Sequence, residues 1–479
     1  MSKEKIYIFD TTLRDGAQTQ GVDFSIDDKL KIANALDNLG VDYIEGGWPG
    51  ANPTDTEFFQ KINKLKNSTL TAFGMTKKTG RSAENDPGLS ALLNTNSPAI
   101  CLVGKSWDFH VKVALEISNQ ENLENISDST KHFVNKKKEF MFDAEHFFDG
   151  YKNNKEYAIS CIKAAYDNGA RWIVLCDTNG GTLPNEVFDI VTEVTKIIPG
   201  KNLGIHAHND TENAVSNSLA AVLAGARQIQ GTINGLGERC GNANLMSIIP
   251  SLHLKKVFRD KFSTNISESN IKNLTQCSRL LDEILNRKPN QHLPYVGASA
   301  FSHKGGLHVS AVQKDPKTYE HIEPSLVGNS RNIIVSDQSG KSNIISRLNS
   351  IGIEFKENDS NIKKLLDEVK DREFIGYSYD GADASFELLA RRIMGTIPRY
   401  ISINDYEVTV KKKSKNEIVS FAKVTLVVDK NSVICEGEGN GPVHALDNAI
   451  RNNIDKLAKY SEYLKDLKLV DYKVRILNT

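Results

Sequence analysis

Residues 6–18 read Ile6-Tyr-Ile-Phe9-Asp10-Thr-Thr-Leu-Arg14-Asp15-Gly16-Ala-Gln18, a short apolar run that passes directly into a charged loop. The β-branched and aromatic residues of Ile6–Phe9 predict a strand that is buried on both faces. In parallel α/β folds, the loops that leave the carboxyl ends of the strands carry the ligand sites. Taken alone, the stretch fits either such a site or an ordinary strand that ends in a solvated turn.

The next 240 or so residues alternate strand-like and helix-like segments. Eight strands, each followed by a helix, over roughly 250 residues predict an α/β fold, a (β/α)8 TIM barrel. The alternative is an open, doubly wound sheet, but the glycine-rich phosphate pattern of that fold is absent after the first strand. The predicted strands are Ile6–Phe9, Tyr43–Glu45, Leu70–Phe73, Ala99–Val103, Glu139–Phe142, Trp172–Cys176, Leu203–Ala207 and Gln228–Ile233. The predicted helices between them include Asp27–Leu39, Thr54–Leu65, Tyr157–Asn168, Asn185–Ile198 and Ala214–Ala224.

Polar residues accumulate directly after these strands. In a closed barrel all eight strand ends face one mouth, which is where enzymes of this fold work. A merely solvated rim would not need the glycines that occur there. The polar groups are Arg14 and Asp15, Glu45, Glu145, Asp177–Gly181, His206–Asp210 and Gly235–Asn242.

Two histidines in the seventh strand segment, His206 and His208, are separated by one residue. The two-residue period of a strand puts both imidazoles on one face, where they can bind one divalent cation. Asp15 and Asn242 add oxygen donors, because the first, seventh and eighth strands are neighbours in a closed barrel. This set of oxygen and imidazole ligands, without thiolate, suits Mg, Mn, Co or Zn. We predict a metal site of Asp15, His206, His208 and Asn242.

Two further charged residues are candidates for chemistry. Arg14, beside Asp15, would direct a cation at a substrate oxygen on which negative charge develops. Its structural alternative is a salt bridge with Glu45, and both can hold, since Glu45 could orient Arg14. Glu145 is a candidate base or substrate contact, and the sequence does not separate this role from that of a rim carboxylate.

The composition excludes several classes of function. Sixty basic and sixty acidic residues leave no net charge, which argues against broad nucleic-acid or membrane-surface binding. No apolar run is long enough to span a bilayer, and the N-terminus leads straight into the first strand without a signal peptide. The six cysteines form no CxxC pair, so we expect reduced thiols in a cytoplasmic protein. Cys240 is expected to be a packing residue and not a ligand.

The chain is expected to divide into three regions: a catalytic barrel over 1–260, helical linker subdomains over 261–395, and a small α+β regulatory or dimerisation domain over 396–479. The linker region contains a small-residue loop, Gly297–His308. The predicted helices of the linker region are Glu268–Asn286, Asn361–Lys370 and Ala384–Arg392. The segments predicted for the last domain are strands Tyr406–Lys411, Ile418–Val428 and Ser432–Glu436, helix Ala445–Ala458 and strand Asp471–Leu477.

The motifs in combination resemble the metal-dependent Claisen-condensing and aldol-cleaving TIM-barrel enzymes, and within them the 2-isopropylmalate, homocitrate and citramalate synthases. The resemblance covers essentially the whole chain and is greatest to the citramalate synthase branch. The motifs that carry it are Asp10–Gln18, Glu45, Gly46–Pro53, Phe142–Tyr151, His206–Asp210, Gly237–Ala243, Ser302–Val312 and Tyr319–Pro324.

The resemblance implies a condensation of acetyl-CoA with a 2-oxo acid and hydrolysis of the thioester. For the citramalate branch the acceptor is pyruvate and the pathway is isoleucine biosynthesis. By position, Arg14 would stabilise the alkoxide, Thr178 would contact the substrate carboxylate, and Glu145 matches an acetyl-CoA or base position. His308 and Tyr319 match residues that reach a neighbouring subunit's site, which implies a homodimer. The metal set is the one derived above.

Three alternatives to this activity stay open. The acceptor could be 2-oxoisovalerate or 2-oxoglutarate, because a few methyl groups in a pocket discriminate by only about 1–3 kcal/mol. A lyase that cleaves a hydroxyacyl-CoA would not need the C-terminal domain, and a non-catalytic paralogue would not need the metal set.

The family's C-terminal domain normally duplicates a strand-rich unit. The chain is expected to end inside that domain, which puts feedback control by isoleucine in doubt.

Overall fold

The computed structural model falls into two compact units, residues 1–333 and 334–479. Among the described residues, no helix has the length and apolar character needed to cross a membrane. The described residues are 3–95, 97–303, 308, 311–312, 314–333, 344–345, 348–349, 351–355, 360–374, 377, 379, 383–397, 400–414, 417–428, 431–453, 462, 466 and 472.

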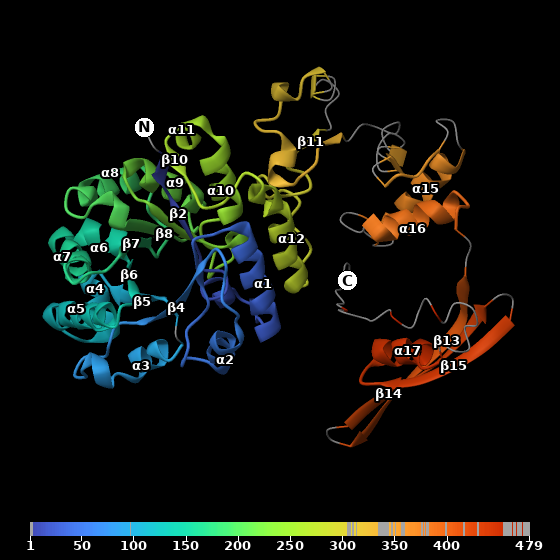
Figure 1. The fold of residues 1–479 in the computed structure, drawn as a ribbon, viewed down its shortest axis with the longest axis horizontal. Helices are drawn as coiled ribbons and strands as arrows, with labels where there is room; N and C mark the ends of the chain where they lie inside the picture. Colours follow the sequence, from blue (N-terminus) through green and yellow to red (C-terminus); the bar gives the residue numbers. More distant parts are fainter. Residues whose placement is uncertain are drawn as a thin grey trace. The chain divides into compact units, whose positions relative to one another are not determined.

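Eight parallel strands close into a barrel in the N-terminal unit, with every strand beside the next one in the chain (Figure 1). The last strand, β9, pairs with the first, β2, from Tyr7↔Gln228 to Asp10↔Gly231. The predicted TIM barrel is therefore confirmed, and the open sheet is excluded. The barrel strands are β2 (Tyr7–Asp10), β3 (Tyr43–Glu45), β4 (Thr69–Met75), β5 (Ala99–Lys105), β6 (Glu139–Glu145), β7 (Trp172–Asp177), β8 (Leu203–Ala207) and β9 (Gln228–Gly231).

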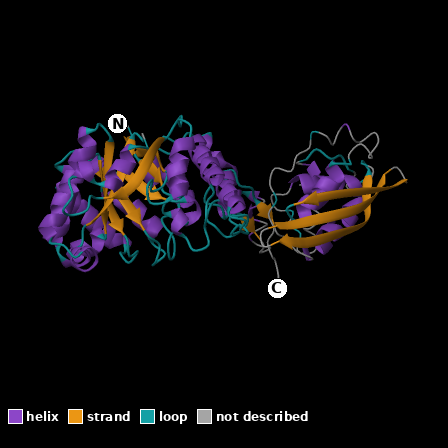
Figure 2. Cartoon of the chain, turned by 90° about the horizontal axis from the view of Figure 1, so that it is seen from below, coloured by secondary structure: helices purple, strands orange, loops and turns teal. Residues whose placement is uncertain are grey.

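Helices cover the outside of the strands (Figure 2). The first, α1, starts at Ser25, whose hydroxyl and Asp28 form a capping box, and stops at Gly40 with a left-handed φ of 93°. The helices of this unit are α1 (Ile26–Leu39), α2 (Pro53–Lys61), α3 (Pro87–Leu93), α4 (Asp108–His110), α5 (Asn119–Asn135), α6 (Phe147–Asn153), α7 (Lys155–Tyr166), α8 (Pro184–Thr195), α9 (Ala214–Ala224), α10 (Leu245–Leu254), α11 (Lys256–Arg259) and α12 (Leu274–Ile284).

Side chains on the strands alternate between two apolar cores. Ile8 of β2 packs with the surrounding helices, whereas its neighbour Phe9 belongs to the barrel interior. The interior also takes Cys101 of β5 and Trp172 of β7. Polar side chains that share this inward direction are consequently held in a buried space below the mouth.

Several element boundaries differ from prediction by a few residues, and two of these differences have an identifiable local cause. The helix predicted over Thr54–Leu65 ends at Lys61, because Ile62 adopts extended backbone. The strand predicted over Gln228–Ile233 ends at Gly231, since the Thr232 hydroxyl donates to Leu236 O at 2.6 Å and closes a turn. The second difference lies in the loop that leaves the mouth end of β9, whereas the first lies before the amino end of β4. Two short strands outside the barrel, β1 (Glu4–Lys5) and β10 (Phe262–Ser263), pair in parallel, and β11 (Ser302–His303) pairs with β12 (Asn332–Ile333).

The C-terminal unit contains helices α15 (Ser360–Phe374) and α16 (Asp383–Ile393), followed by an antiparallel sheet with one helix against it. The predicted α+β arrangement is confirmed. Residues 454–458 of the predicted helix and the predicted strand Asp471–Leu477, apart from residue 472, lie outside the described residues. The sheet and its helix are β13 (Ile401–Ser414), β14 (Glu417–Val428), β15 (Asn431–Gly439) and α17 (Pro442–Arg451).

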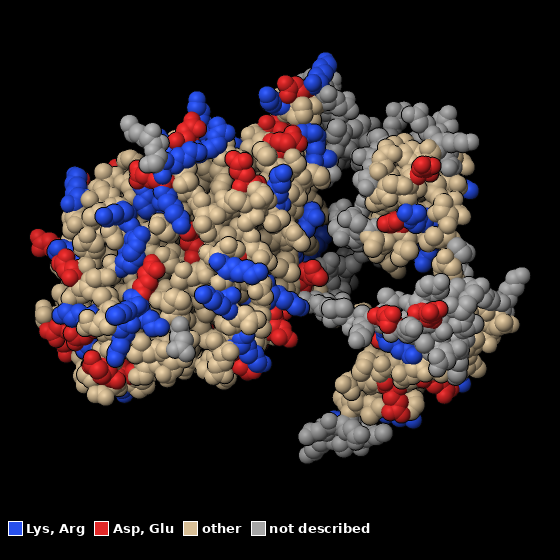
Figure 3. Space-filling view, viewed as in Figure 1, with Lys and Arg blue, Asp and Glu red and all other residues tan. Residues whose placement is uncertain are grey.

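Charge is distributed without a dominant sign. Basic and acidic side chains are interspersed over the visible face of the N-terminal unit (Figure 3), in keeping with the net charge of zero. The exterior of this face therefore offers no broad field of one sign, and a ligand of high charge has to be bound locally.

Candidate functional site

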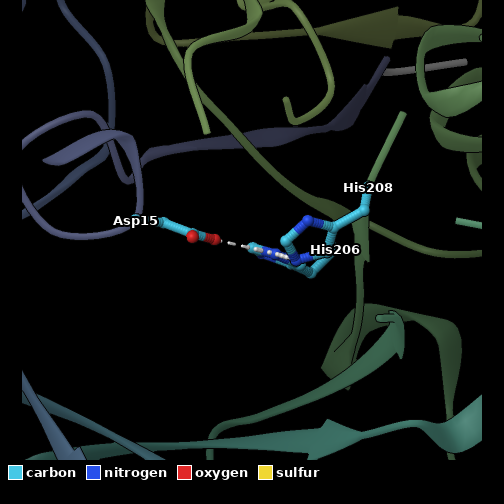
Figure 4. Close-up of side chains that lie close together, drawn as sticks. All are labelled: Asp15, His206 and His208. Atoms are coloured by element: carbon cyan, nitrogen blue, oxygen red, sulfur yellow. Dashed lines mark hydrogen bonds and ion pairs between the residues drawn. The ribbon is translucent and has the colours of Figure 1, made fainter. Parts of the chain in front are cut away.

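Three side chains predicted as metal ligands come together at the mouth of the barrel (Figure 4). Asp15 lies in the loop after β2, His206 lies in β8, and His208 follows that strand. Asp15 Oδ2 is 3.2 Å from His206 Nε2, which is 3.4 Å from His208 Nε2. All three side chains are buried. The predicted shared face of the two histidines is confirmed.

Asn242, the fourth predicted ligand, lies beside His208, because the two residues form an isolated antiparallel bridge. Its side chain is buried, and within the described residues neither Oδ1 nor Nδ2 has a hydrogen-bond partner. Gly237 permits this close packing, since a Cβ there would lie 2.9 Å from Asn242 Cγ. Buried polar atoms without partners are uncommon and costly. A carboxylate, two imidazoles and an orphaned amide oxygen therefore fit a divalent cation.

Burial and charge favour the metal-binding forms of Asp15 and His208, whereas Asp15 raises the pKa of His206 against the effect of burial. Burial raises the pKa of Asp15, but Arg14, His206 and His208 together lower it by more, so its pKa lies well below the usual range. Burial, reinforced by His206, lowers the pKa of His208 to about 3. Asp15 is thus ionised and His208 neutral at pH 7, which are the forms that ligate metals.

Arg14 is anchored on two sides. Its Nε donates to Glu45 Oε2 at 2.7 Å, and its guanidinium carbon lies 3.8 Å from the centre of the Phe73 ring. Its Nη1 is 3.7 Å from Asp15 Oδ2. The predicted Arg14–Glu45 salt bridge is confirmed, and burial raises the pKa of Glu45 to about 7, although Arg14 acts in the opposite direction. Arg14 retains further N–H groups for an oxygen bound next to Asp15.

Glu145, the last residue of β6, pairs with Lys105, the last residue of β5. Both line a cavity of about 520 Å³ at the ends of β4, β5 and β6. Thr178 follows β7, and its Oγ1 accepts from His146 N at 2.8 Å. Glu145 and Thr178 therefore lie at the mouth, as the sequence analysis expects, and their roles stay predictions.

His308 and Tyr319 contact each other. Their rings stack with centroids 4.1 Å apart, and Tyr319 is 44% exposed. Neither belongs to the barrel strands. Their predicted role in a neighbouring subunit's site stays a prediction.

A second buried cluster was not predicted from the sequence, and in it Glu45, Cys101 and Asp143 lie close together. Gln230 of β9, which contacts both His206 and Asp143, was not predicted either. Strand alternation could have found Asp143, because it precedes Glu145 by two residues and so shares its inward direction.

Cys240 is exposed, so its expected packing role is wrong. The reason is a tight turn, in which Gly241 N donates to Glu238 O at 3.0 Å and Arg239 has a left-handed φ of 55°. The other five cysteines are buried, and none of the six forms a disulfide, as predicted.

Comparison with known protein families covers nearly the whole chain. Residues 5–280 match the HMGL-like family, 295–374 match the homocitrate synthase post-HMGL domain-like family, and 380–479 match the LeuA allosteric (dimerisation) domain. Among solved structures, HMG-CoA lyase from Bacillus subtilis shares the fold with a TM-score of 0.52 and 20% identity, over 61% of this chain and 98% of that one.

Curated relatives share more of the sequence than this solved structure does. The chain is 49% identical to the (R)-citramalate synthase of Aquifex aeolicus over 99% of its length and 89% of the relative's. It is 47% identical to the (R)-citramalate synthase of Geobacter sulfurreducens, over 100% and 89%. The 2-isopropylmalate synthase of Sulfolobus acidocaldarius is 32% identical, over 80% of this chain and 95% of that one. The chain therefore belongs to the (R)-citramalate synthase family, on an HMGL-like TIM barrel with a LeuA dimerisation domain.

Proposed function

We propose that the chain catalyses the (R)-citramalate synthase reaction, in which acetyl-CoA, pyruvate and water give citramalate and CoA, for isoleucine biosynthesis. The observation that carries the proposal is the convergence of Asp15, His206, His208 and Arg14 at one barrel mouth. The choice of pyruvate rests on the identity of 43–49% to relatives named for this activity, against 30–32% to 2-isopropylmalate synthases.

The metal proposed for this reaction is a divalent cation, Mn, Mg, Co or Zn. Asp15, His206, His208 and Asn242 would hold it, since their donor atoms are buried and the Asn242 amide has no described partner. When bound, the cation would supply Lewis acidity toward the keto oxygen of the 2-oxo acid.

Arg14 is proposed to stabilise the negative charge that develops on that oxygen. Glu45 and Phe73 fix its guanidinium before substrate arrives, so no reorganisation is needed during the reaction. Thr178, at the end of β7, is proposed to contact the substrate carboxylate.

Acetyl-CoA is proposed to bind in the cavity that Glu145 and Lys105 line. Because a thioester methyl is a weak acid, its deprotonation needs a placed base, and Glu145, which lines this cavity, is the candidate. Lys78 and Arg81 line the same cavity, and no ion pair is described for either side chain within the part of the chain the structure describes. Both are available to the phosphates of CoA.

The assembly is proposed to be a homodimer formed through the LeuA dimerisation domain. His308 and Tyr319 are then candidates to complete the neighbouring subunit's site. Their aromatic stacking keeps both rings together on an exposed segment, which is where residues that serve another subunit have to lie.

The test is release of free thiol from acetyl-CoA by the purified protein with Mn²⁺ or Mg²⁺, using pyruvate, 2-oxoisovalerate and 2-oxoglutarate in separate samples. We expect rapid release with pyruvate, loss of release on chelation, and loss in Asp15→Asn. Preference for 2-oxoisovalerate would retain the chemistry and replace the acceptor. Release with none of the three acids would refute the condensation.

A further inference from the structure

A chain of buried hydrogen bonds runs away from the predicted metal ligand His206. Its Nδ1 lies 2.8 Å from Gln230 Oε1, and Gln230 Nε2 donates to Asp143 Oδ1 at 3.0 Å. His206 and Gln230 are register partners on neighbouring strands β8 and β9, whereas Asp143 belongs to β6, two strands beyond β8. The last bond therefore spans the barrel interior. All three side chains are buried.

The chemistry of these groups fixes the direction of each bond. A carboxylate only accepts hydrogen bonds, so Asp143 holds the amide nitrogen of Gln230 toward itself. The amide oxygen then faces His206, and because it also only accepts, the hydrogen of the imidazole resides on Nδ1. The opposite amide orientation would set two acceptor oxygens against each other in a buried space, which is unfavourable. His206 Nε2, which lies 3.2 Å from Asp15 Oδ2, is then the ring nitrogen that would offer its lone pair to a cation.

We propose that Gln230, oriented by Asp143, is a positioning residue that keeps His206 in the tautomer and ring orientation needed to bind a cation. The inference rests on the metal centre proposed above. Ligating histidines commonly need such a partner on the second ring nitrogen, and loss of the partner costs about 10–100-fold in metal affinity. At the far end of this chain of bonds, the Cys101 thiol and the Glu45 carboxylate lie close to Asp143.

Gln228 offers a matched control on the same strand. It is fully buried, as Gln230 is, and precedes it by two residues, so both side chains enter the barrel interior. The described contact of the Gln228 amide is Nε2 to Met141 Sδ at 3.8 Å, away from the metal set. Replacing either glutamine by methionine removes one amide and retains nearly the same volume.

The test is calorimetric titration of Mn²⁺ into the metal-free 479-residue chain as wild type, Gln230→Met and Gln228→Met. We expect the Mn²⁺ Kd to rise about 10–100-fold in Gln230→Met and less than threefold in Gln228→Met. Thermal unfolding of the metal-free proteins is measured alongside to confirm that both variants fold, and Gln230→Met should lower Tm more than Gln228→Met, because it leaves buried polar atoms of His206 and Asp143 without their partner. Equal Kd values for the two variants would refute the positioning role alone, whereas a wild type that binds no Mn²⁺ would refute the metal centre and the inference with it.

A spectroscopic measurement serves as the second readout, independent of metal and of turnover. Long-range ¹H–¹⁵N correlation on histidine-labelled, metal-free protein reports which ring nitrogen bears the hydrogen, and the His206 signal is assigned by its loss in His206→Asn. We expect a hydrogen on Nδ1 in wild type and Gln228→Met, and a shift in Gln230→Met toward the form with a hydrogen on Nε2 alone, because Asp15 Oδ2 lies 3.2 Å from Nε2 and remains available to accept it. An unchanged His206 tautomer in Gln230→Met would overturn the inference.

Discussion

Arg14→Lys removes the guanidinium from the barrel mouth and retains its charge. In the structure the guanidinium has three neighbours at once, namely Glu45 at 2.7 Å, the Phe73 ring at 3.8 Å and Asp15 at 3.7 Å. A lysine ammonium is a compact point charge without the planar fork, so it cannot pair with Glu45 and stack on Phe73 while it also reaches a substrate oxygen.

The expected fall in kcat follows from the hydrogen-bond donor that the substitution removes. Because Glu45 is fully buried, the ammonium will remain with that carboxylate, and the substrate oxygen loses its donor. Removal of one placed donor from a developing oxyanion costs about 100–1,000-fold in kcat, or roughly 2.7–4 kcal/mol. We expect this loss in kcat for Arg14→Lys, with the Mn²⁺ Kd changed less than threefold, since Arg14 supplies no ligand atom.

Arg171→Lys is the matched control. The Arg171 guanidinium carbon also lies 3.8 Å from an aromatic ring, that of Trp172, but at the amino end of β7. The assay is thiol release at saturating pyruvate and acetyl-CoA, with kcat and KM determined for each variant. The reasoning is refuted if Arg14→Lys retains more than a tenth of the wild-type kcat, or if Arg171→Lys falls as far.

Three further predictions concern stability and cofactor binding. Lys29→Met leaves the buried Asp55 carboxylate without its ion-pair partner and should lower the free energy of unfolding by about 3–5 kcal/mol. Urea titration followed by tryptophan fluorescence measures this loss. The double variant Lys29→Met with Asp55→Asn should recover part of it. Burial lowers the pKa of His253 below the usual histidine value of about 6.5, so its contribution to stability is present above about pH 6.5 and declines as the pH falls. His253→Gln should therefore lose less stability than wild type between pH 7 and pH 5, measured by thermal unfolding. Lys78→Ala with Arg81→Ala should raise the KM for acetyl-CoA about tenfold and leave the KM for pyruvate unchanged in steady-state kinetics, because the two cations line the cavity proposed for CoA.

Local sequence patterns were sufficient to predict the barrel fold. Strand Tyr43–Glu45 and helix Ala214–Ala224 were predicted with the bounds that the structure has. The predicted end of a strand was wrong where a side chain closes a turn, as Thr232 does after β9, because the hydrophobic periodicity of the sequence does not reveal such a turn. The small-residue character of Cys240 suggested packing, but exposure depends on the direction in which a loop leaves the mouth.

The sequence by itself determined the eightfold alternation, the shared face of His206 and His208, and the proximity of Asp15 to both once the barrel closes. These follow from the two-residue period of strands and from the adjacency of the first and last strands. Only the tertiary structure decided which inward side chains meet across the interior. The bonds from Gln230 to Asp143 and the packing of Arg14 on Phe73 join strands that are not neighbours in sequence. Such contacts depend on the stagger and tilt with which eight strands close, and no single strand encodes either quantity.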